Sequence, residues 1–239
     1  IDVIVITFTL VLMIYLGKVF KINRQLSALI AVGTAVCGAA AIVAVSSVIK
    51  TKKEYTALAV ACIAILGTFG ALIYIFLYPV LPLESESYGV LVGATLHELA
   101  HVIAAAAPGG GASMDNAILT KLGRVALLIP AALVLGYLFT EKDPKSSKGS
   151  SKKLRDLPIP WFIFGFLGMS VLTTFGLLPL TISDFLIDAS VYLLAMAMAG
   201  LGLSINFSDF KKVGIKPVIV GVLGFLALAA IGPLLILLL

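Results

Sequence analysis

Apolar residues recur along this chain in stretches long enough to cross a bilayer, which takes roughly 20 apolar residues for one helix. Because lipid cannot satisfy the open edge of a strand, such stretches predict helices. The pattern therefore predicts an all-α polytopic membrane protein with about eight hydrophobic segments. They lie near residues 3–20, 26–49, 55–79, 89–107, 117–139, 159–179, 183–206 and 217–239.

One long polar stretch interrupts this pattern at residues 140–157. Its Ser, Gly and Lys content is typical of a flexible, solvated linker. The linker divides the chain into two parts, with the first five segments in residues 1–139 and the last three in residues 158–239.

Composition supports the membrane class. Of the 239 residues, 61% are hydrophobic and 12% are charged, and the mean hydropathy is +1.15. A soluble domain would carry about 25% charged residues, so an ordinary cytosolic enzyme is excluded. The net charge of +5 comes from short clusters of Lys and Arg between apolar runs. We therefore expect the lipid bilayer as a partner and no nucleic acid, and we predict no cofactor.

The positions of the cations predict a topology. Fifteen of the 17 Lys and Arg residues lie in four loops, near residues 18–25, 50–54, 140–157 and 207–216. If all eight segments crossed the membrane, the first two of these loops would lie on opposite sides, against the positive-inside rule. If segments 26–49 and 89–107 are instead re-entrant hairpins, all four loops become cytoplasmic. Broken spanning helices are the alternative.

Segments 26–49 and 89–107 have the composition that a hairpin or a break requires. Each carries small and polar residues midway, at positions 33–38 and 93–98, and a shift of 60 residues superposes Gly33 on Gly93. With one segment entering from each side, the two halves would form an inverted repeat, the plan of many secondary transporters.

A cluster of ionisable residues falls inside the apolar segments 89–107 and 117–139: His97, Glu98, His101, Lys121 and Arg124. Each costs roughly 2.5–3.5 kcal/mol on insertion scales, so a functional role is the first hypothesis. The simpler alternative is that Lys121 and Arg124 extend to the outer interface and that the histidines are hydrogen-bonded helix contacts.

The sequence His97-Glu98-Leu99-Ala100-His101 matches HExxH, in which two histidines on one helical face bind zinc and the glutamate acts as the base. An intramembrane zinc metalloprotease is therefore the alternative function. These are the only histidines in the chain, so a carboxylate such as Asp115, Asp184 or Asp188 would have to be the third ligand.

Transport is the favoured interpretation, with no enzymatic activity. Hairpin tips would present helix N-termini to a small anion, nearby cations would add positive charge, and the His–Glu pair could carry protons. The predicted substrate-binding residues are Gly33, Thr34, Cys37, Gly38, Thr95, His97, Glu98, Lys121 and Arg124. A helical scaffold without transport would leave the buried charges unexplained.

Several ordered motifs resemble the YeiH-type sulfate exporter family of prokaryotic inner membranes. They are GTAVCGAAAI at 33–42, VIK at 48–50, GATLHELA at 93–100, KLGRV at 121–125, LPIPWF at 157–162 and MAMAGLGL at 196–203. The resemblance implies an inverted-repeat secondary transporter in the inner membrane, distantly similar to sodium/proton antiporters and bile-acid symporters. Coupling to protons or sodium and a homodimer are left open.

Two departures from that family matter. Its members usually have Gln where this chain has His101, so the family pattern does not dismiss a metal site here. They also carry further helices before the position of Ile1, so the resemblance implies that N-terminal helices are missing from this chain.

Overall fold

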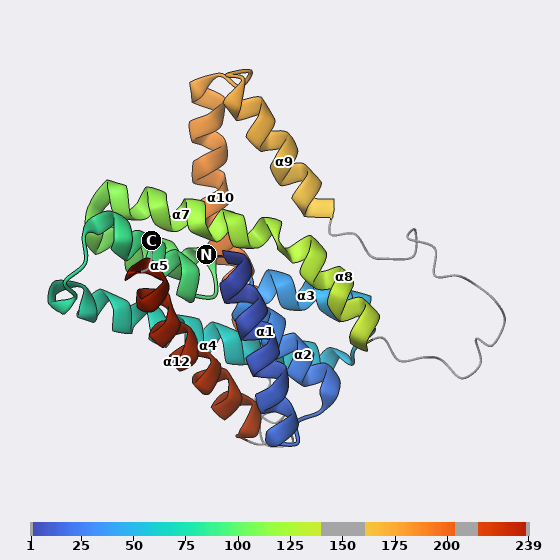
Figure 1. Cartoon of the computed structure of the whole chain (residues 1–239). Coiled ribbons are helices and arrows are strands. Elements are labelled where there is room, and N and C mark those ends of the chain that lie inside the picture. The colour runs from blue at the N-terminus through green and yellow to red at the C-terminus, as the bar shows by residue number, and fades with distance from the viewer. Residues whose placement is uncertain (1, 140–160, 204–214, 238–239) are drawn as a thin grey trace.

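The computed structural model describes residues 2–139, 161–203 and 215–237, and every regular element in these ranges is a helix (Figure 1). The predicted linker at 140–157 and most of the loop at 207–216 lie outside the described residues. The elements in the first range are α1 (Asp2–Val19), α2 (Arg24–Ala35), α3 (Ala39–Val48), α4 (Lys53–Leu77), η1 (Tyr78–Val80), α5 (Ser85–Thr95), α6 (Leu99–Ala106), η2 (Ala107–Gly109), α7 (Gly110–Ala126) and α8 (Leu128–Phe139). The later ranges contain α9 (Trp161–Thr174), α10 (Leu180–Leu203) and α12 (Lys216–Leu237).

The all-helical prediction is confirmed for these residues. Four helical stretches are long and apolar enough to cross a membrane, namely Asp2–Val19, Lys53–Val80, Leu99–Phe139 and Lys216–Leu234. The other predicted segments are either divided into shorter helices or fall partly outside the described residues.

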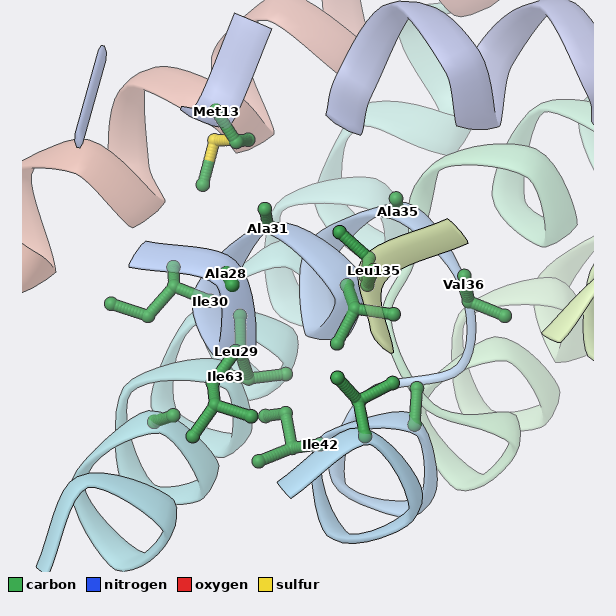
Figure 2. Close-up of a cluster of buried hydrophobic side chains, with 14 of the residues drawn as sticks. Met13, Ala28, Leu29, Ile30, Ala31, Ala35, Val36, Ile42, Ile63 and Leu135 are labelled. Atoms are coloured by element: carbon green, nitrogen blue, oxygen red, sulfur yellow. The ribbon is translucent and has the colours of Figure 1, made fainter. Parts of the chain in front are cut away.

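Helix α2 is the centre of the larger hydrophobic core. The side chain of Asn23 caps its N-terminus by accepting hydrogen bonds from two backbone amides, and every residue from Leu26 to Ala35 is buried. Figure 2 shows why: Met13 of α1, Ile42 of α3, Ile63 of α4 and Leu135 of α8 surround it. A helix that is apolar on all sides must be enclosed in this way.

Helices α5 and α7 make the closest backbone approach in this part of the fold. A Cβ atom on Gly89 would lie 2.2 Å from the carbonyl oxygen of Ser113, and one on Gly93 would lie 2.5 Å from that of Ala117. Glycines four residues apart on one helix therefore meet small residues four apart on the other, a pattern that permits tight packing in membranes.

The close contact between α5 and α7 explains why the predicted start of one helix was wrong. The segment expected to begin near residue 117 begins at Gly110 instead. Gly110 and Gly111 are poor helix formers. Packing of Ser113 and Ala117 against α5 extends the helix in spite of that weak propensity.

Helices α1 and α12 lie against each other beside α2, while α9 and α10 form a pair that projects from the other helices (Figure 1). On α10, Asp184 and Asp188 are exposed. The part of the structure that can position buried polar groups is therefore formed by α1 to α8 together with α12.

We expect Gly93→Ala to destabilise the protein by about 1–3 kcal/mol, because the added methyl group would force α5 away from the backbone of α7. The thermal unfolding midpoint in detergent measures this. Gly111→Ala is the matched control, since a Cβ atom there meets nothing within 4 Å. Equal midpoints for the two variants would contradict the packing.

Candidate functional site

The first predicted break occurs where the sequence placed it. Helix α2 ends at Ala35, the chain passes through Val36, Cys37 and Gly38, and α3 begins at Ala39. Gly38 has a positive φ of 69°, which favours glycine. A Cβ atom on Gly38 would also lie only 2.4 Å from Cγ of Glu98, so this position has two independent reasons to be glycine.

The second break follows the same pattern. Helix α5 ends at Thr95, and the chain passes through Leu96, His97 and Glu98 before α6 begins at Leu99. The breaks begin at Val36 and Leu96, so the shift of 60 residues seen in the sequence superposes them. The contact between Gly38 and Glu98 brings them together in space.

Lys121 of α7 joins the two breaks. Its Nζ donates hydrogen bonds to the carbonyl oxygens of Val36, at 2.9 Å, and Leu96, at 2.6 Å. These carbonyls close the C-terminal ends of α2 and α5, where a helix leaves acceptors unsatisfied and carries partial negative charge. One ammonium group therefore caps two helices.

Arg124, one turn further along α7, repeats the arrangement. Its guanidinium donates to the carbonyl oxygens of Thr34 and Ala35 at the end of α2 and of Ala94 at the end of α5. Only 1% of Lys121 and 0% of Arg124 is exposed. The alternative in which these cations extend to the membrane surface is therefore wrong.

Glu98 places a negative charge at the N-terminal end of a helix, whereas Lys121 and Arg124 place positive charges at C-terminal ends. Its Oε1 accepts a hydrogen bond from the backbone N–H of Ala39, the first residue of α3, at 3.3 Å. A carboxylate is stabilised there because the N-terminal amides of a helix carry partial positive charge. Its Oε2 is buried and has no hydrogen-bond partner among the described residues.

The two histidines do not form the helical pair that HExxH requires. His97 lies in the break before α6, and its ring is tilted against that of Phe225 of α12, with centroids 5.7 Å apart. His101 lies within α6, and its Nε2 is 3.2 Å from Oγ1 of Thr68 on α4. The prediction of a shared helical face was wrong because α6 begins two residues after His97.

A third metal ligand is also lacking in the parts of the chain that the structure describes. Within them, no group of three or more His, Cys, Asp and Glu side chains is arranged to hold a metal ion. Two of the proposed third ligands, Asp184 and Asp188, are exposed on the projecting helix α10. The arrangement therefore does not fit the zinc site of a metalloprotease.

Polar atoms without partners gather at the breaks. Among the described residues, Oγ1 of Thr34 and both ring nitrogens of His97 are buried and unpartnered, like Oε2 of Glu98. Cys37 is a free, buried thiol close enough to Lys121 to interact electrostatically. Buried polar groups normally have partners, so the concentration of unpaired groups at the breaks makes this region the candidate binding site.

Two other predicted site residues have structural roles. The Thr95 hydroxyl forms hydrogen bonds with the carbonyl oxygen of Leu91, at 2.7 Å, and with the hydroxyl of Tyr74, at 2.9 Å. Gly33 allows close packing, since a Cβ atom there would lie 2.7 Å from Ile42 and 3.0 Å from Ile63. Both residues shape the ends of helices beside the break.

Asp2, which was not predicted as a site residue from the sequence, lies in the first turn of α1. Its Oδ2 would be 2.7 Å from a Cβ atom on Gly123, and its charge acts on Arg124 and Lys121. Its Oδ1 is buried and has no hydrogen-bond partner in the part of the chain that the structure describes. The only signal in the sequence was one carboxylate at the edge of an apolar run.

We expect Lys121→Met to lower the free energy of unfolding, because it leaves the carbonyl oxygens of Val36 and Leu96 buried without donors. Each unsatisfied group costs about 1–3 kcal/mol. Thermal unfolding in detergent measures the loss. Lys18→Met, at an exposed position, is expected to change stability by no more than about 0.5 kcal/mol. An unchanged midpoint for Lys121→Met would show that the ammonium does not cap these helices.

Purified protein is expected to contain far less than one zinc per chain, because the rings of His97 and His101 face different helices. Elemental analysis of the protein and of His101→Gln tests this. Stoichiometric zinc that disappears in His101→Gln would contradict the geometry and restore the metalloprotease hypothesis.

Comparison with known proteins agrees with the membrane class. The family model for conserved hypothetical protein 698 matches residues 1–221. A UPF0324 membrane protein of Bacillus cereus (strain ATCC 10987 / NRS 248) is 49% identical over 233 residues, covering 98% of this chain and 65% of the relative. No solved structure matches.

More distant relatives carry the same description. A UPF0324 membrane protein of Listeria monocytogenes serotype 4b (strain F2365) is 43% identical over 98% of this chain and 68% of its own length. One of Staphylococcus aureus (strain MRSA252) is 37% identical over 97% of this chain and 68% of its own length. The chain thus spans about two thirds of the length of these relatives, and it belongs to the conserved hypothetical protein 698 family of UPF0324 membrane proteins.

Proposed function

We propose that this protein is a secondary transporter that moves a small anion across the bacterial plasma membrane by alternating access. The observation that carries the proposal is the meeting of two helix breaks, held together by buried Lys121 and Arg124 and lined by unpartnered polar atoms. Interrupted helices whose ends meet inside the bilayer form the substrate sites of many secondary transporters.

The distribution of helix ends favours an anion. Lys121 and Arg124 neutralise the C-terminal ends of α2 and α5, which leaves the N-terminal ends of α3 and α6 as the positive helix ends at the breaks. A carboxylate oxygen of Glu98 already lies against the first of these. The cations act here as a source of positive potential and as caps, while backbone amides would contact the substrate.

The proposed topology rests on the positions of the two breaks and of the cationic loops. Segments 26–49 and 89–107 enter from opposite sides, as hairpins or as broken spanning helices, and form an inverted repeat. The cationic loops near 18–25, 50–54, 140–157 and 207–216 face the cytoplasm. The shift of 60 residues between the breaks supports the repeat.

Sulfate is the probe of choice because several motifs of this chain resemble the sulfate exporter family. The protein acts in this proposal as a carrier rather than as an enzyme, and the site needs no cofactor. Its partners are the anion and the lipid bilayer.

We expect Thr34→Val to lower sulfate exchange in proteoliposomes by about tenfold, the effect of losing roughly 1.4 kcal/mol of interaction. Its hydroxyl is buried at the break and makes no hydrogen bond within the described residues, so removal should spare the fold. Ser27→Ala is the matched control, because it removes an equally buried and unpartnered hydroxyl from the same helix, two turns away.

Equal exchange rates in the two variants would remove Thr34 from the site. An absence of sulfate exchange in the unmodified protein, tested alongside chloride and succinate, would overturn anion transport itself.

A further inference from the structure

We propose that Glu98 is an internal anion that occupies the N-terminal end of α3 and must be protonated before the transported anion can bind there. The proton is then the coupling ion, and anion and proton move together. This inference rests on the proposed function, which it deepens by naming the coupling ion and the residue that carries it.

The geometry identifies Glu98 as an occupant of the site. Its carboxylate comes from the second break but caps a helix that starts after the first, through the contact of Oε1 with the Ala39 amide. Only 6% of the residue is exposed. A carboxylate and a substrate anion would compete for the same amide, and two negative charges in a buried site repel each other strongly.

The balance of buried charge also favours protonation of Glu98 when an anion binds. Among the described residues around the breaks, Lys121 and Arg124 are opposed by Glu98 and by Asp2, which lies against α7. With all four ionised, the site carries no net charge to attract an anion. Protonation of Glu98 leaves one positive charge in excess and releases the amide of Ala39, so binding of the anion favours uptake of the proton.

Several charged or titratable groups lie around the Glu98 carboxylate. Lys121 of α7 acts on it electrostatically, Cys37 lies in the opposite break, and His97 precedes it in the chain. His101 of α6 also faces it, with Nδ1 3.8 Å from Oε2 of Glu98.

His101 connects this carboxylate to the surface of the described structure. Its other ring nitrogen is 3.2 Å from the hydroxyl of Thr68, an exposed residue of α4. A Cβ atom on Gly67 would lie 2.5 Å from Nδ1 of His101, so a glycine at that position makes room for the ring. His101 is therefore positioned to pass a proton to Glu98, where the carboxylate becomes a carboxylic acid.

The experiment compares sulfate exchange with sulfate accumulation in proteoliposomes. In the unmodified protein, an acid-outside pH gradient should drive accumulation of labelled sulfate above its external concentration. Glu98→Gln mimics the protonated acid and cannot exchange a proton, so, whatever its rate of sulfate exchange at equal pH, its accumulation ratio should no longer respond to the gradient. His101→Gln is the control, since it removes the relay ring but leaves the proton-binding carboxylate, and it should accumulate sulfate more slowly to the same ratio.

Accumulation that persists in Glu98→Gln, or that is lost only in His101→Gln, would overturn the role of Glu98. If the unmodified protein exchanges sulfate but does not respond to the gradient, proton coupling is overturned while anion transport stands. If it does not exchange sulfate at all, the proposed function itself is wrong.

A measurement on the unmodified protein keeps the test independent of how well the variant folds. In weakly buffered detergent solution, addition of sulfate should cause uptake of about one proton for each sulfate bound. Sulfate binding without proton uptake would overturn the inference.

Discussion

The structure depends on two buried cations that donate hydrogen bonds to the last backbone carbonyl oxygens of two helices. When a helix stops inside an apolar protein, its last carbonyl oxygens lose their amide partners, and water is not available to replace them. Lys121 and Arg124 supply the missing donors for α2 and α5 together. The cost of burying two like charges and the cost of ending two helices in the interior thus offset each other, and neither feature would be stable without the other.

This arrangement constrains how the site can work. Helix α7 carries both cations, and its contact with α5 through Gly89 and Gly93 is too close for an inserted side chain. Any movement that separated the two breaks would leave buried carbonyls without donors. The breaks and α7 are therefore held together, and in the proposed transporter a change of access would come from the elements around them.

The sequence predicted the location of the breaks but not the chemistry that holds them together. Small residues at 33–38 and 93–98 predicted the breaks, and the rarity of charge in apolar segments singled out Glu98, Lys121 and Arg124. The partners of the cations could not be predicted, because they are backbone carbonyls, which leave no trace in residue identity. The start of α6 after His97 was missed for a related reason, since the break extends one residue beyond the histidine and only the folded backbone decides that boundary.

The C-terminal and N-terminal helix ends at the site differ in how firmly their partners hold them. Donors on Lys121 and Arg124 are engaged by the carbonyl oxygens of α2 and α5, so their positive charge remains but most of their hydrogen bonds are used. The amide end of α3 is engaged by Glu98, a group whose charge a single proton removes. Of the two ends, the one that can be vacated without leaving carbonyl oxygens unpaired is the positive one, and this is the physical reason for proposing an anion as the substrate.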